Sequence, residues 1–272
     1  MNSCPPQKDG KNSCRLTRGD VSKSTCKVAF TLAEVLITLG IIGVVAALTL
    51  PTLIQNYQKQ VYVNQLKKTY ATLSEGFKQI VASEDCTTLK CSTGFDMRDD
   101  VDTVSFSKNE TLREKIVKEF KLSNIVTGNS SNTSPYDYNV KSLHKDEIKY
   151  SDIFFSSNDL GMIGSTPQGS VITFSPSLIG FAIVVDINGL KQPNTVGRDI
   201  FIFVCIEDYN DSVIVTPLYS SLHFKWLGED IDDEERITYV SKDCSTKTSS
   251  DDDLDGMTCA EKIIMDGWKM DY

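Results

Sequence analysis

KVAFTLAEVLITLGIIGVVAALTLPTLI, residues 27–54, is a long apolar run that determines how the rest of this chain is organised. A single carboxylate, Glu34, stands near its start, and no charged side chain occurs from Val35 to Gln58. A helix needs about 20 apolar residues to cross the hydrocarbon core of a bilayer, so this stretch can span a membrane once. A carboxylate inside a membrane is costly and usually has a partner, which makes Glu34 a candidate functional residue. The alternative interpretation places Glu34 in the headgroup region, where its charge costs little.

The residues before the apolar stretch form a polar, basic segment. Residues 1–29 contain six Lys or Arg and two Asp, for a net charge of +4. They lack the central apolar run of roughly 7–15 residues that marks an ordinary secretory signal. A cationic segment of this kind tends to stay in the cytoplasm while the following helix inserts. We therefore expect residues 1–29 to be a leader and the part of the chain after the span to lie outside the cytoplasm.

The segment from Ala29 to Ile37, AFTLAEVLI, resembles the processing site of type IV prepilins and type II secretion pseudopilins. In that family a prepilin peptidase cuts before the Phe and methylates the new amino terminus. The Glu four residues further on pairs with the terminal amine of a neighbouring subunit. By position, the resemblance implies cleavage between Ala29 and Phe30 and an assembly role for Glu34. The family usually has Gly where this chain has Ala29, which is also small.

The resemblance implies a structural role. The chain is expected to be a pilin or pseudopilin subunit of a type IV pilus or a type II secretion-like filament, and not an enzyme. Its expected partners are the prepilin peptidase, other pilin or pseudopilin subunits, and the membrane. The expected location is the cytoplasmic (inner) membrane, crossed once with the head outside the cytoplasm, and then an extracytoplasmic filament.

Pro51 lies close to the end of the apolar stretch. Proline removes one helix hydrogen bond, so it predicts a kink or a locally loosened turn. An ordinary membrane anchor also tolerates such a proline. Because members of the resembled family often carry a proline at this depth, the resemblance implies that Pro51 lets the helix loosen when the subunit leaves the membrane.

The helix is expected to continue beyond the membrane as an amphipathic segment. Apolar residues recur mostly every three or four positions, which is the period of a helix that is buried on one side. We expect this helix to dock against a sheet and to end near residues 81–85. The predicted organisation is a leader (1–29), a long helix (30–82, membrane-spanning over 30–54) and a globular head (83–272). The apolar residues of the stripe are Leu53, Tyr57, Val61, Leu66, Tyr70, Leu73, Phe77 and Ile80.

The head is predicted to be an α+β domain with an antiparallel sheet. Residues 112–120 favour a short helix, and residues 123–134, rich in Ser, Asn, Thr and Gly, favour a surface loop. Short segments rich in β-branched and aromatic residues predict strands. Their close spacing leaves no room for crossover helices, which excludes a parallel sheet. The predicted strands cover residues 152–156, 171–174, 181–186, 200–206 and 213–217.

Five cysteines remain once the leader is set aside. Disulfides persist outside the cytoplasm, where the head is expected to lie. Cys86 and Cys91 are close in sequence and can staple the loop after the long helix. Cys244 and Cys259 can close a second loop, which leaves Cys205 as a small buried residue in a strand. Sequence alone does not exclude the other connectivities.

The most distinctive polar segment of the head is DINGLKQPNTVGRD, residues 186–199. Asp, Asn and Gly after a strand suit a tight turn whose side chains bond to the backbone. The alternative is a calcium loop with Asp186, Asn188 and Asp199 as ligands, since calcium prefers oxygen ligands. No cofactor is required by this interpretation, and calcium is the one candidate.

A second acidic segment lies near the end of the head. Residues 251–255 match the first half of a calcium loop, but Lys262 replaces the closing Glu, which favours a solvated loop.

No catalytic motif is found in the sequence. The two histidines lie outside any metal or triad pattern, and no phosphate-binding fingerprint occurs. The net charge is −9, and removal of a leader of charge +4 would change it to −13. An acidic head disfavours nonspecific nucleic-acid binding, which depends on Lys and Arg.

The competing hypothesis is a membrane-anchored extracytoplasmic protein that binds a ligand or surface through calcium and uses the helix only as an anchor.

Overall fold

The computed structural model describes residues 31–83, 85–94, 109–127, 135–136, 138–143, 147–150, 153, 161–177, 180–207, 212–220, 232–246 and 256–272. The chain forms two compact units, Met1–Pro51 and Thr52–Tyr272. The predicted leader and the predicted cleavage site, Ala29 and Phe30, lie outside the described residues.

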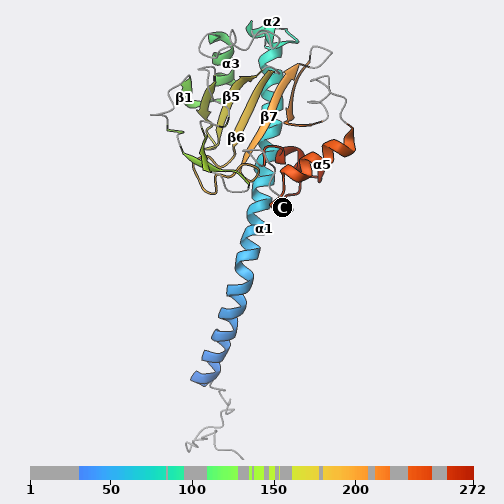
Figure 1. Cartoon of the computed structure of the whole chain (residues 1–272). Helices are drawn as coiled ribbons and strands as arrows, with labels where there is room; N and C mark the ends of the chain where they lie inside the picture. The colour runs from blue at the N-terminus through green and yellow to red at the C-terminus, as the bar shows by residue number, and fades with distance from the viewer. Residues whose placement is uncertain are drawn as a thin grey trace, which may run out of the picture. The chain divides into compact units, whose positions relative to one another are not determined.

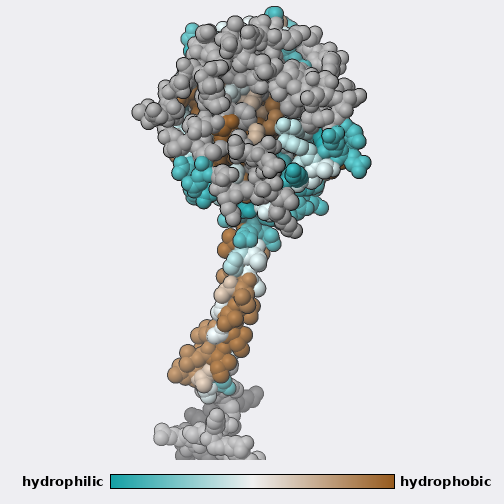
Figure 2. Space-filling model, viewed as in Figure 1, coloured by the Kyte–Doolittle hydropathy of each residue, from teal (hydrophilic) through white to brown (hydrophobic). Residues whose placement is uncertain are grey.

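The first unit contains the beginning of α1, a helix of 51 residues that runs from Leu32 to Ala82. This part of α1 is apolar and its side chains are almost all exposed, which Figure 2 shows as a brown surface along the helix. Within the described residues, α1 is the helix that is long and apolar enough to cross a membrane, and none of its most apolar window is buried. Exposed apolar surface of this extent needs a partner or a membrane to cover it. The α-helix continues through Pro51 without a break in its assignment.

In the second unit, the remainder of α1 becomes the central helix of a packed domain. Burial starts at Val63, not at the start of the predicted stripe. Leu53 and Tyr57 are 65% and 66% exposed, so the expectation that the stripe is buried from Leu53 onward is wrong for these two residues. The buried side is lined by Val63, Leu66, Leu73, Gly76, Phe77, Ile80 and Val81.

The helix packs on a six-stranded sheet, as the sequence predicts (Figure 1). The strand order is β1-β4-β5-β6-β7-β8, and every pair is antiparallel. This confirms the predicted α+β class with an antiparallel sheet. The strands are β1 (Ser123–Thr127), β4 (Met162–Ser165), β5 (Val171–Ser177), β6 (Gly180–Asp186), β7 (Ile200–Glu207) and β8 (Val213–Pro217).

Strand β7 is buried along its whole length, because both faces of the sheet are covered. Successive side chains of a strand point to opposite faces. Phe201, Phe203 and Cys205 belong to the core cluster that contains the buried residues of α1. Ile202 and Val204 belong to a second cluster, which also contains Val140 and Tyr150. The sheet is therefore the middle layer of the domain.

The other elements are α2 (Leu89–Thr93), α3 (Glu110–Phe120), β2 (Asn139–Lys141), β3 (Glu147–Lys149), α5 (Asp233–Asp243) and α6 (Cys259–Met265). Several of them complete the two layers on the faces of this sheet, because α3 and α6 add buried residues to the cluster around α1 and β2 adds Val140 to the second cluster. The helix predicted over 112–120 is confirmed as α3, and four of the predicted strands are confirmed as β5 to β8. The predicted loop at 123–134 is wrong for residues 123–127, which form the edge strand β1. Of the strand predicted at 152–156, the structure describes Ile153, which lies in a turn.

Candidate functional site

Glu34 lies in the first turn of α1 and is held there by Thr31. The main-chain N–H and the hydroxyl of Thr31 both donate to Oε2 of Glu34, at 2.8 and 2.7 Å. The N–H of Glu34 in turn donates to Oγ1 of Thr31 at 3.3 Å. This reciprocal arrangement is a capping box, which satisfies main-chain N–H groups that the first turn of a helix leaves unpaired. Glu34 is therefore oriented by its own helix.

The other carboxylate oxygen of Glu34, Oε1, accepts no hydrogen bond from the residues that the structure describes. A carboxylate accepts several hydrogen bonds at once, so Glu34 can take a further donor without losing Thr31. Sequence reasoning singled out Glu34 but missed Thr31. The signal was present, because Thr three residues before Glu ahead of an apolar run is the sequence pattern of a capping box.

The loop between β6 and β7 brings the three candidate calcium ligands together. Asp186 ends β6 and Asp199 precedes β7, and these two strands are neighbours in the sheet. The side-chain amide of Asn188 donates to Oδ2 of Asp199 at 3.0 Å, and the N–H of Asn188 donates to Oδ1 of Asp186 at 3.1 Å. Both carboxylates are fully buried. The predicted cluster of Asp186, Asn188 and Asp199 thus exists as a spatial cluster.

Hydrogen bonds from the protein already occupy these carboxylates. Oδ2 of Asp186 accepts the hydroxyl of Tyr138 at 2.7 Å. Oδ1 and Oδ2 of Asp199 accept the N–H groups of Thr195 and Asn194, at 2.6 and 2.9 Å. All four carboxylate oxygens therefore accept at least one N–H or O–H donor. This is the turn chemistry that the sequence offers as the alternative to calcium.

Two features of the same loop leave oxygen ligands for a cation. The side-chain oxygens of Asn188 and Asn194 are buried, and neither has a hydrogen-bond partner in the described parts of the chain. A buried polar atom without a partner is costly. On the other hand, no group of three or more His, Cys, Asp or Glu side chains able to hold a metal occurs among the described residues. The loop thus offers calcium two carboxylates and two amide oxygens. However, hydrogen bonds from N–H and O–H groups of the protein already occupy the two carboxylates.

Burial also perturbs the titration of the two carboxylates. Removal from water disfavours the charged form, and it raises the pKa of Asp186 to about 8 despite the hydrogen bonds that the carboxylate accepts. Burial raises the pKa of Asp199 as well. A bound cation would have the opposite effect, because a nearby positive charge favours the carboxylate form.

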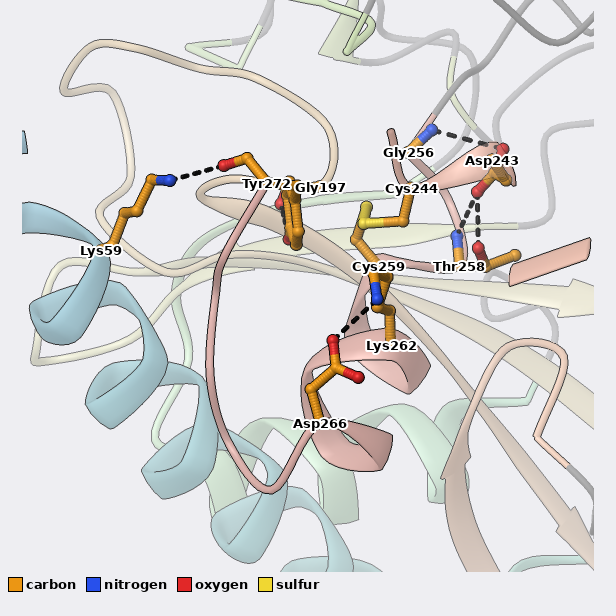
Figure 3. The surroundings of a disulfide bond; sticks show 10 residues. All are labelled: Lys59, Gly197, Asp243, Cys244, Gly256, Thr258, Cys259, Lys262, Asp266 and Tyr272. Atoms are coloured by element: carbon orange, nitrogen blue, oxygen red, sulfur yellow. Dashed lines mark hydrogen bonds and ion pairs between the residues drawn. A yellow bond between two sulfur atoms is a disulfide. The ribbon is translucent and has the colours of Figure 1, made fainter. Parts of the chain in front are cut away.

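Residues 256–272 attach α1 to this side of the sheet, and Figure 3 shows the contacts of Tyr272 with Lys59 and Gly197. Nζ of Lys59, on α1, donates to the main-chain oxygen of Tyr272 at 2.6 Å. The hydroxyl of Tyr272 donates to the main-chain oxygen of Gly197, in the β6–β7 loop. Trp268 packs beside Tyr70 of α1, with 6.2 Å between ring centroids. We call residues 256–272 the C-terminal clasp, because they join α1 to the loop that carries the buried carboxylates.

The clasp is itself tied down by a disulfide and a buried carboxylate. Cys244 pairs with Cys259, while Asp243 accepts the N–H and hydroxyl of Thr258, at 2.9 and 2.6 Å (Figure 3). Gly197 faces the disulfide at a φ of +81°, and a Cβ there would lie 2.7 Å from Sγ of Cys259. Glycine is needed both for the backbone conformation and for the close approach.

The cysteine pairing in the structure matches the favoured sequence interpretation. Cys86 pairs with Cys91, Cys244 pairs with Cys259, and Cys205 is buried as a free thiol. Sequence reasoning missed Lys59, Trp268 and Tyr272, because residues so far apart along the chain show no spacing pattern. The acidic segment 251–255 and both histidines lie outside the described residues.

Comparison with protein-family models, with curated proteins and with solved structures finds no match to this chain.

Proposed function

We propose that this protein is a structural subunit, a pilin or pseudopilin, of a type IV pilus or type II secretion-like filament. One observation carries the proposal. A single helix, α1, starts as an exposed apolar segment with one carboxylate in its first turn and ends as the buried central helix of an α+β domain. Such a helix can first sit in a bilayer and then pack against the same segment of other subunits.

In this proposal a prepilin peptidase cleaves between Ala29 and Phe30 and methylates the new amine. The protein spans the cytoplasmic (inner) membrane once, with residues 52–272 outside the cytoplasm, before it enters the filament. In the filament, Glu34 neutralises the terminal amine of a neighbouring subunit, which avoids two unpaired charges inside an apolar helix bundle. The exposed carboxylate oxygen of Glu34 supports this role, because it can accept the amine while Oε2 stays bonded to Thr31.

Exchange of Glu34 tests the assembly role. Glu34→Leu should insert into the membrane as well as the unchanged protein, since it makes the span more apolar. Its recovery in filaments sheared from cells should fall at least tenfold, because the partner amine loses its counter-charge in a medium of low dielectric. Thr38→Leu is the matched control: it lies one turn further along α1, and its hydroxyl only bonds back to Val35. Equal recovery of Glu34→Leu and the unchanged protein in filaments would overturn the proposed function.

A second candidate function is favoured by a specific observation, the unpartnered buried oxygens of Asn188 and Asn194. They support a calcium-dependent binding or adhesion protein that uses α1 only as an anchor. Co-assembly with filament components separates the two functions. An anchored binding protein would stay in the membrane fraction after shearing, whether or not Glu34 is present.

A further inference from the structure

A polar cleft borders α1 directly beyond its apolar segment. The cleft has a volume of about 450 Å³ and lies between the turn of α1 that carries Lys59 and the loop segment that carries Pro193 and Arg198. Tyr272 of the C-terminal clasp also lines it. The cleft thus combines two cationic side chains with the hydroxyls and amides of its remaining lining residues.

Arg198 supplies an exposed positive charge at this cleft. Its main-chain N–H donates to the main-chain oxygen of Thr195, but its guanidinium makes no hydrogen bond or ion pair with the part of the chain that the structure describes. Lys59 is held in place by its hydrogen bond to the main-chain oxygen of Tyr272 and keeps two further N–H donors. A guanidinium and an ammonium that face one cleft are suited to a phosphate group, which accepts several charge-assisted hydrogen bonds.

The charges along α1 indicate where this phosphate would come from. From Val35 to Ser74 the helix contains no Asp or Glu, and its first three charged residues after Glu34 are Lys59, Lys67 and Lys68. The part of α1 next to the span therefore carries no acidic side chain, and its first charged residue is Lys59. Basic residues in this position attract anionic lipid headgroups.

The distance along the helix agrees with a lipid headgroup. Ile54 is the last residue of the apolar stretch, and at 1.5 Å per residue Lys59 lies about 7 Å beyond it. The headgroup layer on each side of the hydrocarbon core is about 5–7 Å thick, so Lys59 lies at the level of the lipid phosphates when Ile54 lies at the edge of the core. Tyr57, which is 66% exposed, falls within the layer where aromatic residues are enriched.

The acidic groups near the cleft do not cancel its charge. Asp186 and Asp199 act on Tyr62 of the cleft lining, but burial raises the pKa of both carboxyls, which favours their neutral form. In the neighbouring clasp, Asp266 is paired with Lys262 at 2.7 Å, and Asp271 is the other acidic side chain. Lys269 and Lys59 also line a second cleft of about 520 Å³, which shares Met270 with the first. The cations at this end of the domain therefore exceed the acidic side chains beside them.

We propose that the cleft between α1 and the β6–β7 loop binds the phosphate of an anionic phospholipid, with Arg198 and Lys59 as its ligands. The inference rests on the membrane span of the proposed function but not on filament assembly. The lipid would hold the β6–β7 loop and the C-terminal clasp at the membrane surface until the subunit leaves the bilayer.

The test uses the full chain in nanodiscs of equal parts phosphatidylglycerol and phosphatidylcholine. Native mass spectrometry then counts the lipids that stay bound to the protein. Because each basic residue near a membrane surface contributes about 1 kcal/mol, the retained lipids should contain phosphatidylglycerol and phosphatidylcholine at a ratio of about five to one instead of one to one. Arg198→Gln should remove most of this enrichment, and Arg198→Lys should restore part of it. Millimolar inorganic phosphate should not displace the lipid.

Lys191→Gln is the control, because Lys191 is an exposed residue of the same loop that does not line the cleft. It should retain the enrichment in full. Equal enrichment in Arg198→Gln and the unchanged protein would overturn the proposal, and so would an equal loss in Lys191→Gln. Displacement by inorganic phosphate would overturn the choice of a lipid. Lipid retention and filament recovery are separate measurements. A variant that loses filament recovery but keeps its lipid retention would bear on the proposed function and not on the lipid site.

Discussion

Glu34 and Thr31 are joined by a reciprocal set of hydrogen bonds in the first turn of α1. The carboxylate accepts the N–H and the hydroxyl of Thr31 through the same oxygen, Oε2, so its other oxygen points to no donor among the described residues. The capping interaction and a contact with a neighbouring subunit are therefore compatible. Thr31 acts as a positioning residue for the carboxylate that the proposed assembly requires.

Exchange of Thr31 tests this positioning role. Thr31→Val keeps the main-chain donor and the shape of the side chain but removes the hydroxyl, and loss of a capping side chain costs about 0.5–2 kcal/mol. Recovery of the variant in sheared filaments should fall a few-fold, which is less than for Glu34→Leu. Thr31→Ser retains the hydroxyl and should behave as the unchanged protein. If Thr31→Val and the unchanged protein are recovered equally, the capping box does not position Glu34.

Processing of the leader is the second prediction. The mature protein purified from its host should begin at Phe30, with a methylated amine, as intact-mass and N-terminal peptide measurements can show. Ala29→Gly should be cleaved normally, because the residue stays small. Ala29→Leu should accumulate with its leader, because a large side chain replaces a small one directly before the bond that is cut. A mature chain that still contains residues 1–29 in filaments would contradict the resemblance to prepilins.

The third prediction concerns the contact between α1 and α3 at Gly76. A Cβ at Gly76 would overlap with Cε1 and Cζ of the Phe120 ring. The ring of Phe120 has little room to move, because it packs against Phe77 and Phe174. Gly76→Ala should lower the free energy of unfolding by about 1–3 kcal/mol, the usual cost of overpacking a core.

A double-mutant cycle shows whether this cost comes from the ring. Phe120→Leu shortens the side chain that faces Gly76, so the double variant should be more stable than the sum of the two single effects predicts. Chemical unfolding of the detergent-solubilised full chain gives the three values. Additive effects would place the cost of Gly76→Ala elsewhere in the helix.

Stability should also depend on pH through Asp186. Its folded pKa of about 8 lies above the ordinary value of 3.8 for an Asp side chain, so between these two pH values the folded state holds a proton that the unfolded state has lost. The stabilisation is complete below about pH 4 and is lost as the pH rises towards and through 8, and each pKa unit corresponds to about 1.4 kcal/mol. Without calcium, the full chain should resist denaturant better at pH 5.5 than at pH 8.5. Asp186→Asn should flatten this difference.

Asp85→Asn serves as the control for the pH experiment, since Asp85 is an exposed residue in the turn after α1. It should keep the full dependence on pH. A chain that is equally stable at both pH values would show that Asp186 is ionised in the folded state. That result would in turn favour a cation beside the carboxylates.

The parts of the fold that sequence predicted are those with a strong local pattern. The long helix and strands β5 to β8 carry apolar runs whose length and composition identify them. Strand β1, Ser123 to Thr127, was missed because its short β-branched run, Ile125 to Thr127, was grouped with the residues rich in Ser, Asn, Thr and Gly that follow it. It becomes a strand through main-chain pairing with β4 at the edge of the sheet, where it bulges between Ser123 and Val126. A run of three β-branched residues is too short to identify an edge strand without this pairing.

The same difference between local sequence patterns and long-range contacts decides which parts of the candidate sites could be predicted. Asp186 and Asp199 were grouped correctly, because the strands before and after them are close in sequence and pair in the sheet. The sequence did not group Lys59, Gly197 and Tyr272, since their contacts form only when the C-terminal clasp packs back against α1. The cleft beside Arg198 exists only because of that return, so the sequence alone could not have located it.

The last prediction concerns calcium at the β6–β7 loop. Calcium takes 6–8 oxygen ligands, and the carboxylates of Asp186 and Asp199 with the amide oxygens of Asn188 and Asn194 can supply part of this shell. Binding to the folded state alone raises stability by mass action. If calcium binds, the full chain should melt at a higher temperature in millimolar calcium than in chelator. Water and main-chain oxygens would complete the shell.

Three variants locate the site. Asp186→Ala should abolish the difference between calcium and chelator, because it removes a buried ligand. Asn194→Ala should reduce the difference, since its buried oxygen has no other partner in the described structure. Asp253→Ala should leave the difference unchanged if the acidic segment 251–255 is a solvated loop. Equal melting of the unchanged protein in calcium and chelator would mean that hydrogen bonds alone hold the loop, as the donors on Asp186 and Asp199 allow. Loss of the difference only in Asp253→Ala would move the site to residues 251–255.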